Sequence, residues 1–353
     1  MPFRPICSLI LLSSALGIAP QCGLRTATAE PPVVAETPQF IVTKALSLLE
    51  RGAKEYPEHR QCFACHHQTL PLLAHREAER LKIERKPEFE ASTLEFVDAS
   101  FRGKIADLNA GEGIGGKGLT VGYGLWTFRL GNHPADDLTR AMVTFLLKTQ
   151  AEDGHWGLHS IRPPSEESVA FATVLAAAGV AHFADESQHA DRDRAVEKAR
   201  NWLRTAERPL HEDRVAHAWG WKRLGGSEEE RDAARTALFE SQQPDGGWRQ
   251  TDELPSDAYA SGTAVYALME TGVSSDHPAI RRGVEFLSRT QKPDGSWHVA
   301  TRAKPVQVFF DNGDPHGKDQ FISLMATGWA AAAIARGTTA DPVPGQSHNA
   351  RSP

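Results

Sequence analysis

The chain lacks an excess of basic charge and, after its first thirty residues, any long apolar run. Its 353 residues carry a formal net charge of −6 with a pI near 6.2, and no Lys/Arg cluster overrides that average. A protein without a basic field is poorly suited to nucleic acid or acidic lipid, so we expect no nucleic-acid partner. No later stretch approaches the ~20 apolar residues that cross a bilayer. We therefore expect no membrane span in the mature chain.

The first 29 residues differ from the rest and predict a secretory signal peptide. Arg4 supplies a positive start, residues 6–19 are mostly apolar, and residues 27–29 (Ala-Thr-Ala) fit a small-residue cleavage site. An uncleaved anchor is the alternative. Export predicts a periplasmic or secreted protein, with residues 30–38 as a linker and 337–353 as a disordered tail.

Cysteine is also scarce, because the chain has four and the predicted cleavage removes two of them, Cys7 and Cys22. The mature chain keeps only Cys62 and Cys65, which lie together in a CFACHHQ stretch. Strand patterns are scarce as well, and residues 297–310 form the only long stretch without a helical period. We expect those residues to form a loop over one rim of the fold.

What the chain does contain is a motif that occurs three times: a glutamine, two residues, Asp-Gly, one residue and a tryptophan. In each copy a helical stretch ends at the Asp-Gly turn, where glycine supplies the positive φ that stops a helix. The first gap between copies is nearly twice the second, so a degenerate copy is expected between them, and residues 202–205 resemble one. Repeats of this length indicate stacked supersecondary units. The repeat residues are Gln150, Asp153, Trp156, Gln242, Asp245, Trp248, Gln291, Asp294 and Trp297.

Two kinds of helix alternate along the chain. Residues 280–291 carry apolar side chains at i, i+4 and i+7, which predicts an amphipathic helix. Residues 168–178, 261–269 and 326–335 are apolar nearly all round and rich in small residues, which predicts helices buried on most sides. A two-layer ring needs both kinds. We therefore predict an all-α fold, an α/α toroid of about six inner and six outer helices over residues 39–336.

The three repeats resemble the signature of the squalene–hopene cyclase and protein prenyltransferase β-subunit superfamily, whose fold is an α/α toroid. The resemblance implies that the Gln side chains bind backbone groups at helix ends and that the Trp rings stack on them, so the repeat residues are structural. Further stretches are similar to a group of secreted bacterial toroid proteins with an N-terminal CxxCHHQ motif. These stretches are 62–68 (CFACHHQ), 162–166 (RPPSE), 212–214 (EDR), 256–262 (SDAYASG) and 316–329 (HGKDQFISLMATGW).

The residues that the superfamily uses for its known chemistry are missing. Its cyclases protonate an alkene or epoxide with an Asp-rich DxDDTA motif. When that motif is anchored on Thr263, the four preceding positions are Tyr, Ala, Ser and Gly. Asp257 lies ahead of this window and is interpreted as a helix cap. The prenyltransferase zinc site is missing too, because both mature cysteines belong to the N-terminal pair.

Cys62, Cys65 and His66 have the spacing of c-type haem attachment, in which two thiols hold the macrocycle and the next residue ligates the iron. Two alternatives stay open: a structural or redox-active disulfide, and a zinc site. His316, in a loop rich in Gly, Asp and Pro, is a candidate distal ligand, with a solvated loop histidine as the plainer interpretation. His67 is too close in sequence to be the distal ligand, and we expect it to reach the haem propionates or a partner.

Four acidic residues are weak catalytic candidates, and each also has a structural interpretation. Asp257 and Asp319 fit helix starts, whereas Glu212 and Asp213 fit an ion-paired network with Arg214. The sequence as a whole predicts an exported toroid that carries haem c and serves electron transfer, with a redox partner protein, or a redox step on an apolar ligand. The alternatives are a cyclase-like protein without the acid, which binds or cyclises an isoprenoid and has its cysteines in a disulfide, and a non-catalytic scaffold.

Overall fold

The computed structural model describes residues 36–305 and 308–338, so the predicted signal peptide and most of the linker and tail lie outside the described residues. Every regular element within this part of the chain is a helix, and none of these helices is both long and apolar enough to cross a membrane. The α-helices are α1 (Pro38–His59), α2 (Thr69–Ala78), α3 (Pro87–Arg102), α4 (Ile105–Ala110), α5 (Lys117–Leu130), α6 (Asp137–Thr149), α7 (Val169–Phe183), α8 (His189–Thr205), α9 (His211–Leu224), α10 (Glu228–Glu240), α11 (Ala258–Glu270), α12 (Pro278–Thr290) and α13 (Gln320–Gly337). Three short 3₁₀ helices are η1 (Glu79–Leu81), η2 (Glu186–Gln188) and η3 (Gly317–Asp319).

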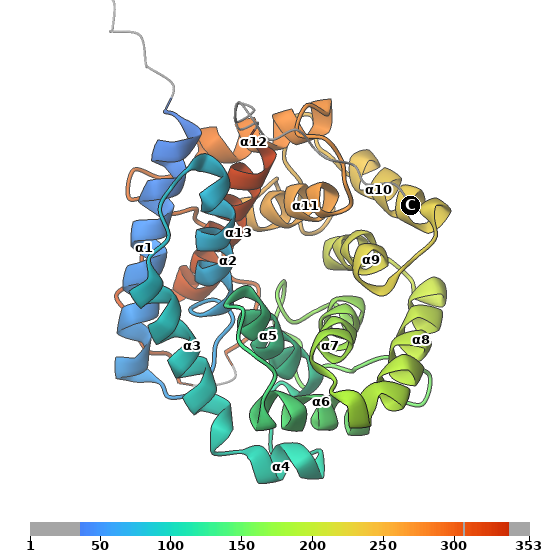
Figure 1. The fold of residues 1–353 in the computed structure, drawn as a ribbon. Helices are drawn as coiled ribbons and strands as arrows, with labels where there is room; N and C mark the ends of the chain where they lie inside the picture. The colour runs from blue at the N-terminus through green and yellow to red at the C-terminus, as the bar shows by residue number, and fades with distance from the viewer. Residues whose placement is uncertain (1–35, 306–307, 339–353) are drawn as a thin grey trace, which may run out of the picture. The chain divides into compact units, whose positions relative to one another are not determined.

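In the described residues, six helices form a closed inner ring: α2, α5, α7, α9, α11 and α13 (Figure 1). Each of them contacts the next in this order, and α13 closes the ring against α2. The helices between them in sequence, α1, α3, α6, α8, α10 and α12, form the outer layer, and the short α4 packs beside α6. This arrangement confirms the predicted α/α toroid. Because inner and outer helices alternate, all inner helices run the same way, so their N-terminal ends form one rim and their C-terminal ends the other.

Small residues let the inner helices approach one another closely. A Cβ atom on Gly122 of α5 would lie 3.0 Å from the backbone nitrogen of Ala176 in α7. A Cβ atom on Gly262 of α11 would lie 2.9 Å from the backbone nitrogen of Ala330 in α13. Helices α7, α11 and α13 are buried along nearly their whole length, as their apolar sequences predict. Outer helix α12 buries one face and exposes the other, as its amphipathic pattern predicts.

Aromatic side chains fill the centre of the ring. The Trp126 ring of α5 lies 5.0 Å from the Trp219 ring of α9 and 5.8 Å from the Trp329 ring of α13, although neither helix is next to α5. Phe171 packs on Trp219 at 5.6 Å, and Tyr266 packs on Trp329 at 5.4 Å. Side chains from opposite sides of the ring therefore meet in the middle and contribute to the core.

The three glutamines of the repeat join consecutive outer helices. The amide of Gln150 donates to Gly154 O in its own turn and to Ala195 O of α8, at 2.8 and 2.9 Å. The second copy makes the same pair of bonds, to Gly246 O and to Ala279 O of α12. The third donates to Gly295 O and to Ile41 O of α1, at 3.0 and 2.9 Å. The last copy thus connects the end of the chain to its beginning and closes the outer layer.

The three tryptophans of the repeat join each outer helix to the inner helix that follows it. Their rings are at most 1% exposed, and each indole N–H donates to a carbonyl near the end of the preceding outer helix at 2.8–2.9 Å. Each backbone N–H donates to a hydroxyl of the following inner helix, from Thr173, Ser261 or Thr327. In the degenerate copy, Leu203 O near the end of α8 accepts instead from His217 of α9 at 3.0 Å.

Candidate functional site

The segments that set this chain apart in sequence all meet at the N-terminal rim of the inner ring. Residues 62–68 lead into α2, 162–166 precede α7, 212–214 open α9, 256–262 span the start of α11, and 316–329 contain the start of α13. Segments up to 267 residues apart are therefore brought to one end of the ring by the common direction of the inner helices. The site is a property of the fold, and no single segment forms it.

The CFACHHQ stretch forms a closed turn that runs into α2. Ala64 O accepts from the backbone N–H groups of His67 and Gln68 at 3.0 and 3.1 Å, and the Gln68 side chain accepts from Ala64 N at 2.8 Å. Both cysteines are free. The exposed Cys62 has its sulfur 3.7 Å from the Tyr56 hydroxyl, whereas burial raises the pKa of the Cys65 thiol to about 12, with a smaller contribution from Glu166.

Behind the cysteines, a buried chain of hydrogen bonds runs from Asp314 through His67 to His66. His67 Nε2 lies 2.9 Å from Asp314 Oδ2, and His67 Nδ1 lies 2.5 Å from His66 Nδ1. Asn312 donates to Asp314 at 2.9 Å, and its amide nitrogen also lies 3.1 Å from His67 Nε2. Burial raises the pKa of Asp314 and holds the pKa of His67 down to about 3, so His67 is neutral. In the tautomer that donates from Nε2 to an ionised Asp314, His67 accepts at Nδ1 and His66 donates from Nδ1.

This assignment leaves His66 with a free lone pair on Nε2. Among the described residues, that nitrogen has no hydrogen-bond partner, and the ring is held by stacking on Phe321 at 5.1 Å. Histidines that ligate metals are oriented in this way, through the ring nitrogen that does not bind the metal. The same geometry corrects the expectation for His67: its side chain is 0% exposed and enclosed by Tyr56 and Asp314, so it faces neither a propionate nor a partner.

His316 is oriented away from this turn. Its Nε2 lies 2.7 Å from the Ser296 hydroxyl, and its ring stacks on His298 at 4.7 Å. The pKa of His316 is lowered mainly by burial, and the neighbouring charges that also affect it come from His298, Asp294, Lys292 and Asp319. The structure therefore does not bring His316 to His66 as a distal ligand, because its ring nitrogen already has a partner in the last repeat turn.

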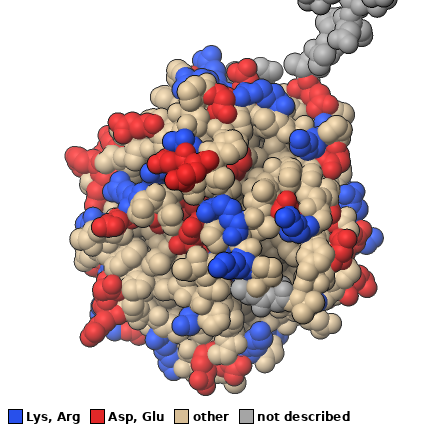
Figure 2. All heavy atoms as spheres, turned by 180° about the vertical axis from the view of Figure 1, so that it is seen from behind, with Lys and Arg blue, Asp and Glu red and all other residues tan. Residues whose placement is uncertain are grey.

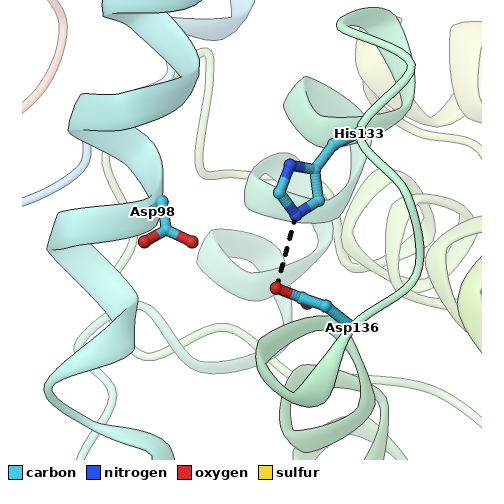
Figure 3. Close-up of side chains that lie close together, drawn as sticks. All are labelled: Asp98, His133 and Asp136. Carbon is cyan, nitrogen blue, oxygen red and sulfur yellow. Dashed lines mark ion pairs between the residues drawn. The ribbon is translucent and has the colours of Figure 1, made fainter.

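Within the described residues, one group of three possible metal ligands has its donor atoms within 4.8 Å of one another: Asp98, His133 and Asp136. Figure 3 shows Asp98 on α3 facing His133 and Asp136 across a gap. Arg102 fills the role of the cation there, because its guanidinium donates to both Asp98 oxygens and to Asp136. This is a partly exposed ion-pair network, and Asp136 also caps α6 by accepting from Thr139 N. Cys62, Cys65, His66 and His67 do not converge as closely, so the geometry does not favour the zinc alternative.

Glu212 differs from every other carboxylate at this rim. It lies in the first turn of α9, is 3% exposed, and neither of its carboxyl oxygens has a hydrogen-bond partner among the described residues. Burial raises the pKa of Glu212 well above its ordinary value, and the nearby Glu167 and Asp257 add to the effect. The ion-paired network that the sequence favours is therefore wrong for Glu212, whose burial favours the protonated form.

The aromatic hydroxyls of Tyr123 and Tyr259 surround the same point. Burial raises the pKa of both, and the charges of Glu212 and Cys65 contribute to each shift. The Tyr123 hydroxyl is buried without a partner, like the carboxyl group of Glu212. Tyr259 stands in the window where the superfamily's cyclases carry their acid. The rim thus brings a buried carboxyl group and a thiol close enough to affect the pKa of both phenols.

The loop predicted to cover a rim does cross this one. Arg302 donates to Glu167 before α7 and to Gln250 before α11, both at 2.8 Å. Gln250 in turn donates to Asp257 at 3.0 Å. Asp319 holds the same loop, because it accepts from the backbone of Thr301 at 2.9 Å. The loop therefore closes over the region of Glu212.

Asp257 has the helix-capping role that the sequence favours, whereas Asp213 makes no ion pair with Arg214 among the described residues and binds other groups. Asp257 caps α11 by accepting from Ala260 N at 2.9 Å. Asp213 accepts from the Ser168 hydroxyl at 2.6 Å and from Leu210 N at 3.1 Å, which ties the starts of α7 and α9 together. Neither carboxylate is free for other chemistry.

The side of the molecule shown in Figure 2 carries no large patch of a single charge sign. On the side shown in Figure 2, Lys and Arg side chains alternate with Asp and Glu, and uncharged residues separate them. Steering of a strongly charged macromolecule is not expected from such a surface.

Sequence reasoning missed Asp314, Asn312 and Arg302. Asp314 lies 247 residues from His67, and nothing in the Gly/Asp/Pro-rich loop around it distinguishes it from its acidic neighbours. Arg302 sits 135 residues from Glu167. The one available signal was the unusual length of the 291–319 connection, because long loops tend to carry function.

No protein-family model matches the chain. Over 209 residues, which is 57% of the chain and 24% of the relative, it is 30% identical to the squalene–hopene cyclase of Bradyrhizobium diazoefficiens. The chain therefore spans about a quarter of the length of this curated relative. The resemblance to squalene–hopene cyclase is confirmed.

Solved structures agree on the fold. A protein from Actinoplanes matches with a TM-score of 0.53 and 15% identity, covering 84% of this chain and 100% of that one. A variant of the type II terpene cyclase MstE from Scytonema, in complex with geranylgeranyl dihydroxybenzoate, matches with a TM-score of 0.50 and 11% identity, covering 84% and 98%. The chain has the fold of terpene cyclases. Identities this low show the fold alone and leave the chemistry to the site.

Proposed function

We propose that this chain is an exported haem c protein whose toroid carries the haem at the N-terminal rim and transfers electrons to a partner protein. The observation that carries the proposal is the free Nε2 of His66, fixed by the Asp314–His67 chain directly beside two free thiols. The donor set fits the group: Cys62 and Cys65 would form the thioethers, and His66 would ligate the iron. When bound, the haem supplies one-electron chemistry.

An uncovered apolar surface beside the turn supports the proposal. Among the described residues, the large apolar side chains that are exposed are Phe40, Ile161, Val308 and Phe309. Val308 is 85% exposed and lies by Arg60, which stacks on Phe310 at 4.0 Å, and Phe310 packs on Tyr56 beside Cys62. Ile161 is 71% exposed and precedes Arg162, whose charge acts on both Cys65 and His66.

An exposed apolar patch of this kind favours an apolar group or a partner that covers it. A macrocycle joined to Cys62 and Cys65 would lie against it, and the polar chain behind His66 would keep the ligand nitrogen directed at the iron. Export to the periplasm, the compartment in which such groups are attached, is part of the proposal. The redox partner would approach from the same side.

The test is to express the full chain with haem-attachment machinery in the periplasm of a bacterial host. We expect a Soret band that survives denaturation and an intact mass that includes one haem. Cys62→Ser should lose the covalent haem. Asp314→Asn should keep both thioethers but weaken or alter the iron ligation in the visible spectrum. An intact mass with no added group, in a host that matures a control cytochrome, would contradict the proposal.

Glu212 favours a second function, proton donation to an unsaturated isoprenoid. Burial raises the pKa of this carboxyl group well above its ordinary value, and it lies near aromatic side chains, which stabilise developing positive charge. The similarity to squalene–hopene cyclase supports this chemistry, as does the isoprenoid substrate held by the MstE fold. Because aromatic rings fill the centre of the ring, the ligand would enter at the N-terminal rim, under the Arg302 loop.

Incubation with squalene and with geranylgeraniol, followed by product analysis by gas chromatography and mass spectrometry, tests this function. Glu212→Gln keeps the shape of the side chain and should abolish any product. Glu285→Gln, on the exposed face of α12, is the matched control and should leave the yield unchanged. Product formed equally by the Glu212→Gln protein would rule out Glu212 as the acid.

A further inference from the structure

Two histidines that neither proposed function uses stack on each other where the last repeat turn meets the start of α13. The ring centroids of His298 and His316 are 4.7 Å apart, and the ring planes differ by 25°. His298 directly follows the last repeat tryptophan, and His316 directly precedes η3. The pair therefore brings together the two ends of the long connection from α12 to α13.

Each of the two rings is held through its Nε2 atom. His298 Nε2 lies 2.9 Å from Asp319 Oδ2, and the imidazole is the donor because an ionised carboxylate can only accept. His316 Nε2 lies 2.7 Å from the Ser296 hydroxyl. That hydroxyl donates its one proton to Asp294 Oδ1 at 2.6 Å, so it accepts from the His316 ring.

With these bonds made, each neutral ring carries its lone pair on Nδ1. Among the described residues, no hydrogen bond reaches the Nδ1 atom of either histidine. Each ring has a carboxylate behind it, Asp319 directly and Asp294 through Ser296. An imidazole that is held on one nitrogen and open on the other is arranged as a metal ligand, because the bond behind it fixes the ring and raises its basicity.

The backbone of His316 is in the left-handed region, with φ 79° and ψ 16°. The turn uses this conformation, because His316 O accepts from Asp319 N at 3.0 Å. A glycine would adopt it freely, whereas a residue with a Cβ atom loses about 1 to 2 kcal/mol. The turn alone therefore does not explain why an imidazole stands at this position.

We propose that His298 and His316 bind one divalent transition-metal ion, such as Zn²⁺, Ni²⁺ or Cu²⁺, through their Nδ1 atoms, with water completing its coordination. Imidazole suits these metals, whereas Mg²⁺ and Ca²⁺ prefer oxygen ligands. Zinc–nitrogen bonds of ~2.0–2.1 Å place two ligand nitrogens at most ~4 Å apart. Binding therefore requires the His298 ring, which is 43% exposed, to tilt toward His316.

A stacked pair of rings can also serve only to support the connection, and that role must be separated from binding. Support needs the shape of the rings and leaves the stability of the protein independent of metal ions. Binding predicts that the ion stabilises the folded chain, because it joins the two ends of the connection that carries Arg302 across the rim.

The experiment is isothermal titration calorimetry of the full chain with Zn²⁺, in a parent that carries Cys62→Ser and Cys65→Ser. Removing these two thiols takes away competing ligands and makes the result independent of the haem proposal. His298→Asn and His316→Asn should each weaken Zn²⁺ binding by about tenfold or more. Asparagine is chosen because it tolerates the left-handed backbone of residue 316. His155→Asn, which changes the one histidine of the first repeat turn, is the matched control and should bind as the parent does.

Thermal unfolding is the second measurement. Zn²⁺ should raise the Tm of the parent and of His155→Asn, and raise it less or not at all in His298→Asn and His316→Asn. The proposal is overturned if Zn²⁺ binds the His298→Asn protein as tightly as the parent, or if all four proteins show the same Tm shift. Mg²⁺ that binds as tightly as Zn²⁺ would also overturn it, because the carboxylates around Asp98 would then be the site. Circular dichroism verifies that each variant is folded, and the exposed His298→Asn decides the matter alone if His316→Asn is not.

Discussion

The two rims of the inner ring are made by opposite ends of the same six helices, yet they differ in chemistry. The N-terminal rim buries polar groups without partners, such as Glu212 and Tyr123, and covers them with a loop. At the C-terminal rim, Glu270 pairs with both Arg223 and Arg336. The helices cannot be the cause of this difference, because they are shared.

The connections explain the difference. Three of the connections from outer to inner helices are long, namely 150–168, 241–257 and 291–319, all at the N-terminal rim, whereas the connection from α8 to α9 is the short segment 206–210. Inner helices return through short ones, such as 131–136, 184–188 and 225–227, at the C-terminal rim. Long connections can carry side chains across the ring, as Arg302 does, whereas short turns can only present the ends of the helices themselves. In this fold, loop length decides which rim can hold a covered site.

The largest loss of stability is expected when a repeat tryptophan is removed, because these side chains connect the outer helices to the inner helices at the N-terminal rim. Trp297→Ala removes a fully buried indole and its bond to Leu287 O, and should lower the free energy of unfolding by about 3 to 5 kcal/mol. Trp202→Ala, in the degenerate copy on α8, removes a half-buried ring and should cost less than half as much. Urea denaturation of the two variants measures the difference, and equal losses would mean that the repeat residues do not make this connection.

A second experiment measures how Glu212, at the N-terminal rim, makes the stability of the protein depend on pH. The pKa of Glu212 is raised in the folded state, so between its ordinary pKa of 4.5 and the folded value the unfolded state loses a proton that the folded state keeps. Stability then falls as pH rises, by up to ~1.4 kcal/mol per pH unit for this one group. Glu212→Gln should remove that contribution and be more stable than the parent at pH 7. If the two proteins have parallel stability profiles from pH 4.5 to 8, Glu212 is ionised when folded.

The smallest effect is expected at the C-terminal rim. Glu270→Gln breaks the charge pairing with Arg223 and Arg336, and should lower the free energy of unfolding by about 2 kcal/mol at low salt. The loss should shrink in 0.5 M salt, because a half-exposed rim is screened. A variant as stable as the parent at low salt would show that these ion pairs are not stabilising and would weaken the contrast between the rims.

Much of the fold could be predicted from the sequence because its signals are local. The repeats do mark helix ends, although each helix ends just before the repeat glutamine and the positive φ of Gly154, Gly246 and Gly295 shapes the turn that follows. The alternation of apolar and amphipathic helices implies two layers. The capping role of Asp257 was also predictable, since a cap depends on residues within one turn, whereas the ion pair predicted between Asp213 and Arg214 is not present among the described residues. The CxxCHHQ stretch was readable as a site, and its haem stays a prediction.

The geometry of the site could not be predicted, because its contacts cross the ring. Asp314 orients His67, and Arg302 covers the region of Glu212, across separations of more than a hundred residues that no local pattern encodes. The charge state of Glu212 depends on burial beneath a loop from another part of the chain. His316, a plausible ligand by its loop, is held by Ser296 instead.

The sequence by itself determined that the chain forms helices of two kinds, that its repeats stop them, and that Cys62, Cys65 and His66 stand together. Each of these depends on residues within a few positions of one another. Only the tertiary structure decided which rim receives the polar segments, which groups surround His66 and His67, and that burial raises the pKa of Glu212. Those properties depend on which surfaces exclude water, and water is excluded only when the ring has closed.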